Sequence, residues 1–199
     1  SLLAKLIKVD HAVELLESQG VFRLKIYMDG IFGGSQKSKA VKSLVDDKFF
    51  VNAYKRVNAL FEAGIEHPKM ELLENIVRKK LENYVIKIIV FTQFRDSAER
   101  IVEKINSIKA GSAKLFVGQA KRNGVGMSQK EQKEIISNFS GGEFNVLVST
   151  SVGEEGIDIP SVDLVVFYEP VPSAIRHIRR KGRTGRHSKG NVLIFVTKG

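Results

Sequence analysis

The sequence predicts an α/β fold with a parallel sheet, preceded by a small all-α domain. From residue 66 onward, short apolar runs rich in Val and Ile alternate with helical patterns, which is typical of βαβ units. These runs are bounded by polar, Gly or Pro residues, as expected for strands buried on both faces of a parallel sheet. Residues 1–65 show helical spacing with no strand pattern, which favours a helical bundle. The expected domains are therefore residues 1–65 and residues 66–199.

Three helices are expected in the first domain. Residues 2–18 carry an apolar stripe and are followed by Gly20 as a stop signal, so an amphipathic helix is predicted. A second helix is expected over residues 21–32, and a third, single helix over residues 37–63. The stripe of the first helix, predicted to face the core, consists of Leu2, Leu6, Val9, Val13 and Leu16.

The first helix of the second domain is predicted to begin at Pro68, because proline is favoured in the first turn of a helix. Ser128 and Glu131 have the spacing of a capping box and mark the start of a later helix. Two of the expected strands end at Thr150 and at Glu169. The other expected elements are a strand over 85–91, a helix over 97–108, a strand over 113–117, a helix over 128–139 and a closing strand over 191–197.

Composition limits the possible functions of the chain. The 199 residues carry a formal net charge of +10, which favours a polyanionic partner such as nucleic acid. The absence of cysteine excludes disulfides and thiolate metal sites, and the four histidines show no ligand spacing. No apolar run approaches membrane-spanning length, and no signal peptide is visible. Because the chain does not begin with Met, we expect a piece of a larger protein. An intracellular compartment is the default expectation.

The segment IRHIRRKGRTGR contains a pair of arginines suited to a polyphosphate. Arg183 and Arg186 are one helical turn apart, with Gly182 and Gly185 interleaved. Glycine allows close approach of the backbone to a ligand, and guanidinium groups bind phosphate oxygens in a planar fork. In phosphoryl transfer such an arginine finger stabilises the transition state. The alternative is a solvated basic patch that lies on nucleic acid, but the interleaved glycines favour the nucleotide role.

The Gly-rich acidic segment SVGEEGIDIP is expected beside these arginines. It follows the strand that ends at Thr150, and ligands of open parallel sheets collect at the carboxyl ends of strands. Three polar or small pairs close strands at this edge: Thr92 with Gln93, Gly118 with Gln119, and Ser149 with Thr150. Backbone amides and small hydroxyls bind phosphates without reading sequence. A second possibility for each pair is simple capping of a strand end.

These segments resemble the motifs of superfamily 2 helicases. IIVFTQFRDSAE is similar to motif IV, STSVGEEGIDIP to motif V and RRKGRTGR to motif VI. The stretch FVGQAKRNGVGMSQKEQKEIISNFSGGEFNVLVST resembles the Hef/FANCM group of fork-DNA helicases. The resemblance covers about residues 65–199 and implies a RecA-like (P-loop NTPase-like) C-terminal motor domain, with residues 1–65 as a thumb-like helical insertion that is truncated or complete.

The resemblance assigns residues to two sites. Arg183 and Arg186 would act as catalytic arginine fingers, and Asp158 would bond the ribose or orient the attacking water through its neighbours. The implied nucleotide-binding residues are Gly153, Gly156, Asp158, Arg183 and Arg186. The implied DNA-binding residues are Thr92, Gln93, Arg95, Gly118, Gln119, Lys121, Arg122, Ser149 and Thr150.

Two parts of a working ATPase are missing from the sequence. There is no GxxxxGK[ST] phosphate loop, and no Asp-Glu pair follows an apolar strand. Glu169 ends an apolar strand, but its position between motifs V and VI argues against a metal role. We therefore expect no ATP hydrolysis by this chain alone. ATP and Mg²⁺ would be bound jointly with an N-terminal RecA-like domain of the same protein.

The implied function is that of an ATP-dependent DNA helicase or translocase acting on forked or branched DNA during repair of stalled replication forks. A C-terminal nuclease domain follows in some members of the group and not in others. The expected location is the cytoplasm or nucleoid of an archaeon, or the nucleus of a eukaryote. Two alternatives remain: a double-stranded RNA helicase of the RIG-I-like or Dicer type, and a non-catalytic nucleic-acid-binding module. The RNA helicases resemble the chain less well around VGQA and RRKGRTGR.

Overall fold

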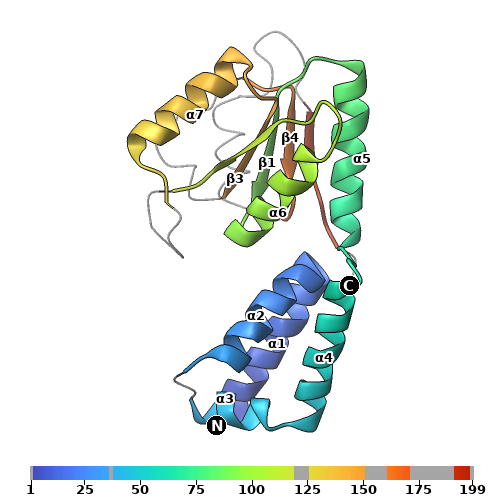
Figure 1. Cartoon of the computed structure of the whole chain (residues 1–199), viewed down its shortest axis with the longest axis vertical. Helices are drawn as coiled ribbons and strands as arrows, with labels where there is room; N and C mark the ends of the chain where they lie inside the picture. The colour runs from blue at the N-terminus through green and yellow to red at the C-terminus, as the bar shows by residue number, and fades with distance from the viewer. Residues whose placement is uncertain (1, 36–37, 119–125, 151–160, 171–190, 198–199) are drawn as a thin grey trace. The chain divides into compact units, whose positions relative to one another are not determined.

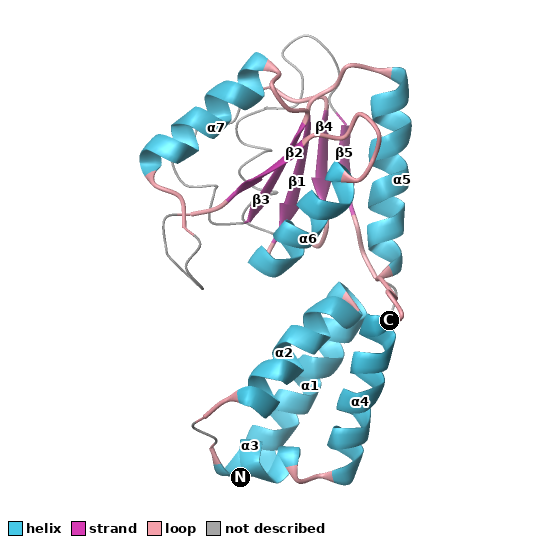
Figure 2. Ribbon diagram, viewed as in Figure 1, coloured by secondary structure: helices cyan, strands magenta, loops and turns pink. Residues whose placement is uncertain are grey.

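The computed structural model describes residues 2–35, 38–118, 126–150, 161–170 and 191–197 (Figure 1). The chain divides into two compact units, and the division falls between Pro68 and Lys69. The first unit is all-helical and the second contains the sheet (Figure 2). The α/β class with a preceding all-α domain is confirmed.

Four helices form the first unit: α1 (Leu2–Gln19), α2 (Val21–Gly33), α3 (Lys39–Val45) and α4 (Lys48–Glu62). Their apolar residues meet in one core, to which every helix contributes. The buried members of this core are Ala12, Val21, Leu24, Met28, Ile31, Leu44, Phe50 and Val57.

The single helix expected over residues 37–63 is wrong, because two helices occupy this stretch. Ser38 caps α3 by accepting a hydrogen bond from the backbone N–H of Val41 at 3.3 Å. The carboxylate of Asp47 then accepts from the N–H groups of Phe49 and Phe50, at 2.9 and 3.0 Å, and starts α4. Aspartate is a favoured N-cap residue, so Asp47 was the sequence signal for the second start.

The orientation predicted for the first helix is also wrong. The residues of its expected core stripe are all exposed, from 38% for Val9 to 69% for Leu2. The side chains of α1 that are buried are Ala12, Leu15 and Gln19. The stripe was chosen by hydrophobicity alone, whereas the residue of α1 that packs in the core of this unit is the small Ala12.

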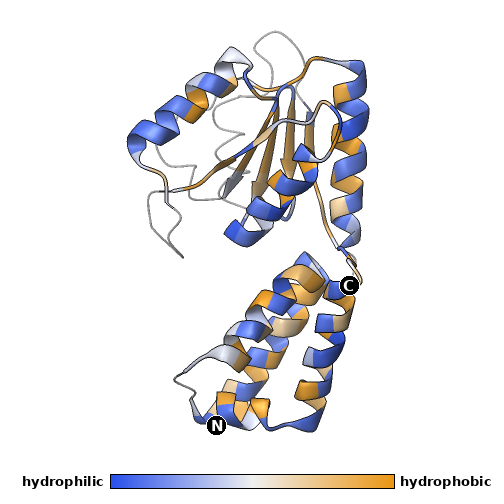
Figure 3. Ribbon diagram, viewed as in Figure 1, coloured by the Kyte–Doolittle hydropathy of each residue, from blue (hydrophilic) through white to orange (hydrophobic). Residues whose placement is uncertain are grey.

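The second unit is a five-stranded parallel sheet in the order β2-β3-β1-β4-β5. The strands are β1 (Ile88–Thr92), β2 (Ala113–Phe116), β3 (Val146–Thr150), β4 (Leu164–Phe167) and β5 (Asn191–Ile194). Among the described residues of this unit, three helices accompany them: α5 (Pro68–Asn83), α6 (Arg95–Asn106) and α7 (Gln129–Gly141). In Figure 3 the strands are mostly hydrophobic, whereas the helices alternate in hydropathy.

Alternate residues of the strands pack against helices on opposite faces of the sheet. Ile88 and Val90 of β1 lie in one core with residues of α5 and α6, such as Leu73 and Ile101. Ile89 and Phe91 lie in the other core, with Phe139 of α7. This three-layer arrangement explains why the strands are continuously apolar, and it confirms the parallel-sheet prediction.

The free edge of β2 is covered by side chains. Asn106 accepts a hydrogen bond from the N–H of Ala113 at 2.7 Å and donates to its carbonyl at 3.3 Å. One residue beyond the strand, Gln132 of α7 donates to the carbonyl of Val117 at 2.8 Å. These contacts take up backbone groups that an edge strand otherwise presents to other chains.

The predicted helix start at Ser128 is confirmed. Its side chain accepts from the N–H of Glu131, while the Glu131 carboxylate accepts from the N–H of Ser128 at 2.6 Å. The strand expected from Val85 begins later, at Ile88, and Val85 is fully exposed. Among the helices that the structure describes, none is long and apolar enough to cross a membrane.

Candidate nucleic-acid interface

The carboxyl ends of β2, β3 and β1 lie side by side, because these strands are neighbours in the sheet. Thr92 at the end of β1 is in register with Thr150 at the end of β3. Ser149 is in register with Phe116, which ends β2 two residues before Gly118. The structure therefore brings Thr92, Ser149, Thr150 and Gly118 to one edge of the sheet, as the sequence predicted.

The hydroxyl groups at this edge are turned into the protein. Thr92 and Thr150 are 0% and 5% exposed, and Ser149 is 2% exposed. The Ser149 hydroxyl donates to the carbonyl of Thr150 at 3.1 Å. Gly118 is buried, and its carbonyl accepts from the N–H of Met127 at 3.3 Å. Arg95, which begins α6, is half-buried.

A buried glutamate links the end of β1 to the end of β4. The Thr92 hydroxyl donates to Oε1 of Glu169 at 2.8 Å, and the backbone N–H of Gln93 donates to the same oxygen. Glu169 is only 4% exposed. The side chain of Gln93 is exposed, and its Nε2 donates to the carbonyl of Pro170 at 3.1 Å. Gln93 is thus attached to the residues after β4 through both its backbone and its side chain.

A buried lysine lies next to this glutamate. Lys69, in the first turn of α5, is 6% exposed, and its Nζ donates to the carbonyl of Tyr168 at 3.1 Å. The same Nζ lies 4.8 Å from the centroid of the Tyr168 ring. Burial lowers the pKa of Lys69, because the charged ammonium loses its water, and the negative charge of Glu169 opposes this shift. The attraction of the Glu169 carboxylate therefore offsets part of the cost of burying the ammonium.

Sequence reasoning missed both members of this pair. Glu169 was considered only as a metal ligand and set aside, and Lys69 was not singled out. A glutamate directly after an apolar strand was a visible signal of a buried carboxylate, but nothing in the sequence identified its partners.

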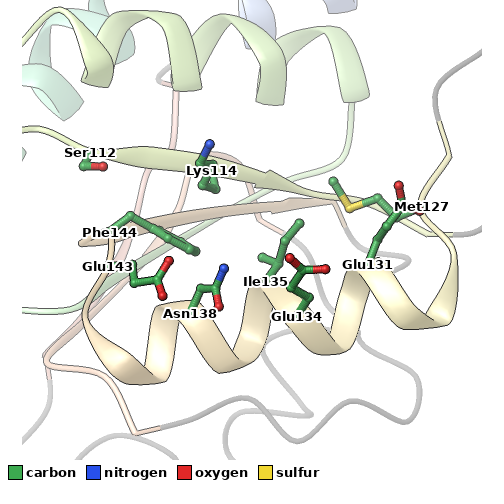
Figure 4. A pocket seen from close by; sticks show the side chains of 9 residues that line it. All are labelled: Ser112, Lys114, Met127, Glu131, Glu134, Ile135, Asn138, Glu143 and Phe144. Atoms are coloured by element: carbon green, nitrogen blue, oxygen red, sulfur yellow. The ribbon is translucent and has the colours of Figure 1, made fainter.

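One groove lies elsewhere, between α7 and the edge strand β2 (Figure 4). It has a volume of about 410 Å³, and Ile135 and Phe144 project into it. Its other lining residues are Ser112, Lys114, Met127, Glu131, Glu134, Asn138 and Glu143. Three carboxylates make it unsuitable for a nucleic-acid backbone. Within the described ranges, no group of three or more His, Asp or Glu side chains could hold a metal ion.

Comparison with known families decides the identity of the second unit. Residues 68–188 match the family model described as the helicase conserved C-terminal domain. The chain belongs to this family. Residues 2–67 match a second model, a helical bundle described for candidate ATP-dependent RNA helicases.

The similar proteins are considerably longer than this helicase C-terminal domain and its bundle. A Methanocaldococcus jannaschii protein, named as a candidate ATP-dependent RNA helicase, is 47% identical over 97% of the chain, which spans 24% of that protein. An ATP-dependent DNA helicase of Neurospora crassa is 40% identical over 83% of the chain, which spans 15% of it. The crystal structure of the Pyrococcus furiosus Hef helicase domain superposes with a TM-score of 0.77 and 48% identity, covering 98% of this chain and 40% of that one.

The remaining predicted site residues of this helicase C-terminal domain lie outside the described residues. They comprise the nucleotide set and the basic loop after β2, namely Gly153, Gly156, Asp158, Arg183, Arg186, Gln119, Lys121 and Arg122. The resemblance to superfamily 2 helicases and to the Hef/FANCM group is confirmed by the family match and by the similarity to Hef and to the fungal DNA helicase.

Proposed function

We propose that this chain is the C-terminal half of an ATP-dependent superfamily 2 DNA helicase or translocase. It would act on forked or branched DNA in the repair of stalled replication forks. The similarity to Hef and to a fungal ATP-dependent DNA helicase supports this function, and so does the net charge of +10. Because the chain spans less than half the length of these relatives, activity would require further parts of the protein.

The observation that carries the proposal is the alignment of three strand ends at one sheet edge. Gly118 after β2, Thr150 of β3 and Gln93 after β1 come from adjacent strands. Phosphates bound there would contact backbone amides and the exposed Gln93 side chain. Thr92, Ser149 and Thr150, whose side chains are buried, would support this surface. Lys121, Arg122, Arg95 and Gln119 would extend it.

The nucleotide site would be shared with an N-terminal RecA-like domain of the same protein. Arg183 and Arg186 would supply positive charge to the phosphates, and Gly153, Gly156 and Asp158 would line the cleft. Glu169 is unsuited to Mg²⁺, because its Oε1 already accepts two hydrogen bonds in the interior. ATP and Mg²⁺ would thus be held mainly by the other domain, and this chain alone would not hydrolyse ATP.

Fluorescence anisotropy of the whole chain with a labelled DNA fork tests the DNA proposal. We expect affinity to fall steeply with salt, since a backbone-bound strand displaces counterions with a slope of about −0.7 per phosphate on a single strand. The variant Lys121→Ala/Arg122→Ala should reduce this slope, and Lys79→Ala/Lys80→Ala, two adjacent basic residues in α5, provides the matched control. Binding that does not depend on salt would contradict the proposal.

The arginine fingers are tested in the full-length protein. Arg183→Ala should lower the DNA-stimulated ATPase rate by about 10³-fold or more, while binding of the DNA fork by the same variant stays measurable. An unchanged ATPase rate would remove the finger assignment.

An RNA helicase is the second candidate function. The names of the M. jannaschii relative and of the bundle family favour it. Tighter binding of duplex RNA than of forked DNA would favour the RNA helicase over the DNA helicase. A non-catalytic binding module would bind nucleic acid but show no effect of Arg183→Ala in the full-length protein. For the DNA helicase, the proposed location is intracellular, and the longer protein is of the group in which some members carry a C-terminal nuclease domain.

A further inference from the structure

The hydrogen-bonded ladder between β1 and β4 continues past the strands through a side chain. The last ladder contact is the N–H of Tyr168, which donates to the carbonyl of Phe91 at 2.8 Å. Beyond this point the contact between the two chain segments is made by the Glu169 carboxylate, which accepts hydrogen bonds from the Thr92 hydroxyl and the Gln93 N–H. The start of the loop after β1 is thereby fixed to β4 at the place where a loop would otherwise be free to move.

The side chain of Gln93 is also held by the residues after β4. Its Nε2 donates to the carbonyl of Pro170, the residue after Glu169. Two successive residues after β4 therefore hold one residue after β1, once by its backbone and once by its side chain. Gln93 remains exposed at the carboxyl edge, so a rigidly held amide side chain faces the solvent there.

A carboxylate at this place requires an explanation, because its charge repels phosphate. Glu169 is 4% exposed and does not reach the surface where a strand would lie. Burial of an isolated carboxylate is unfavourable unless it is paired and hydrogen-bonded. Two donors to Oε1 and the nearby ammonium of Lys69 offset part of this cost. The effect of Glu169 at the edge is therefore the placement of Gln93.

We propose that Glu169 is a positioning residue for nucleic-acid binding, because it fixes the backbone of Gln93 at the carboxyl edge, with the side chain held by the next residue, Pro170, for contact with one phosphate. This inference rests on the proposed function. Glu169 itself touches neither the nucleic acid nor the nucleotide.

Two double variants of the whole chain separate positioning from packing. Lys69→Met/Glu169→Gln removes both charges but keeps an amide oxygen that can accept from Thr92 and Gln93. Lys69→Met/Glu169→Leu has the same charge and a similar volume but no acceptor. The measurements are the melting temperature, the Kd for a labelled DNA fork as a function of salt, and the hydrogen-exchange rate of the Gln93 amide.

The glutamine variant should keep most of the affinity and a protected Gln93 amide. The leucine variant should bind about tenfold more weakly because one phosphate contact is lost, while its salt slope should stay close to that of the glutamine variant, since Gln93 carries no charge. Equal Kd and equal Gln93 exchange in the two folded variants would overturn the positioning role. If the leucine variant unfolds, the comparison uses Thr92→Val, which removes the hydroxyl, and Thr92→Ser, which keeps it.

Failure of the proposed function would look different. A wild-type chain that does not bind nucleic acid would refute the DNA surface and, with it, this role of Glu169. A wild-type chain that binds with a salt-dependent Kd, together with equal Kd and equal Gln93 exchange in both variants, would refute the positioning role alone.

Discussion

His67 lies so close to Gly20 that a Cβ atom added to the glycine would approach the Cβ of His67 to 2.7 Å. Gly20 joins α1 to α2 with φ 84° and ψ −168°, a conformation that only glycine adopts readily. His67 is held on the same corner by a hydrogen bond from its Nε2 to the carbonyl of Glu17 at 2.9 Å. The corner of the bundle therefore needs a residue with no side chain.

Gly20→Ala should lower the free energy of unfolding of the first unit by about 3 kcal/mol, because backbone strain and the contact with His67 add together. Gly64→Ala is the matched control, since Gly64 also has a positive φ, 70°, but no atom within 4 Å of an added Cβ. Its effect should be about 1 kcal/mol. Urea denaturation followed by circular dichroism measures both, and equal losses would show that the His67 contact contributes nothing.

A pH-dependent contribution is expected from Asp29 in the first unit. Its carboxylate accepts from the hydroxyl of Tyr54 and from Nζ of Lys25, both at 2.7 Å. Burial of the carboxyl opposes ionisation, but these two hydrogen bonds outweigh it and hold the pKa of Asp29 below its ordinary value of 3.8. A lowered pKa in the folded state stabilises the fold above the unfolded pKa, and this stabilisation is lost as the pH falls through the folded pKa.

Tyr54→Phe should therefore lower the free energy of unfolding by about 1 kcal/mol near neutral pH, and the difference from wild type should shrink at acid pH. Tyr27→Phe is the control, because the Tyr27 hydroxyl donates to the carbonyl of Lys8, which does not titrate. Denaturation at neutral pH and near pH 3 tests this. A Tyr54→Phe effect that is the same at both pH values would contradict the Asp29 linkage.

Lys69 should affect stability in the alkaline range, again with stability rising as the pH rises. Its pKa in the folded state is below 10.5, so between the two values the unfolded chain binds more protons and stability rises with pH. Lys69→Met should abolish this rise. It should also destabilise the fold by about 3–5 kcal/mol, because a buried cation near Glu169 is removed. Adding Glu169→Gln should recover part of the loss, and additive effects would show that the two groups are not coupled.

Ala110 adopts a left-handed conformation with φ 68°, in the turn between α6 and β2. Ala110→Gly removes about 1–2 kcal/mol of strain, although glycine also gives the unfolded chain more freedom. The variant should be as stable as wild type or more so. Ala53→Gly, in the exposed middle of α4, should instead lose about 1 kcal/mol. Thermal unfolding compares the two, and equal losses would mean that the turn carries no strain.

The sheet could be predicted from sequence because its signals are local. Buried strands such as Ile88–Thr92 are continuously apolar, and the capping box at Ser128 marks a helix start through two residues three positions apart. The bundle was less predictable, since the core face of α1 depends on what its neighbours cover, and Ala12 is buried while Leu6 is exposed. A hydrophobic stripe shows which face is apolar, not which face finds a partner.

The candidate site was predictable in its location and not in its internal bonding. That Thr92 and Thr150 meet at one edge follows from the rule that parallel strands end together. That the Thr92 hydroxyl turns inward to Glu169 depends on β4 being the neighbour of β1, although the two residues are 77 positions apart in the sequence. Such a contact requires the strand order, which no local pattern contains.

The amide side chains of Asn106 and Gln132 hydrogen-bond to the outer edge of β2, where a sixth strand would otherwise pair. A second molecule that approached β2 would find the carbonyls of Ala113 and Val117 already bonded. Addition of a strand from a second copy is therefore disfavoured at these two positions along the β2 edge.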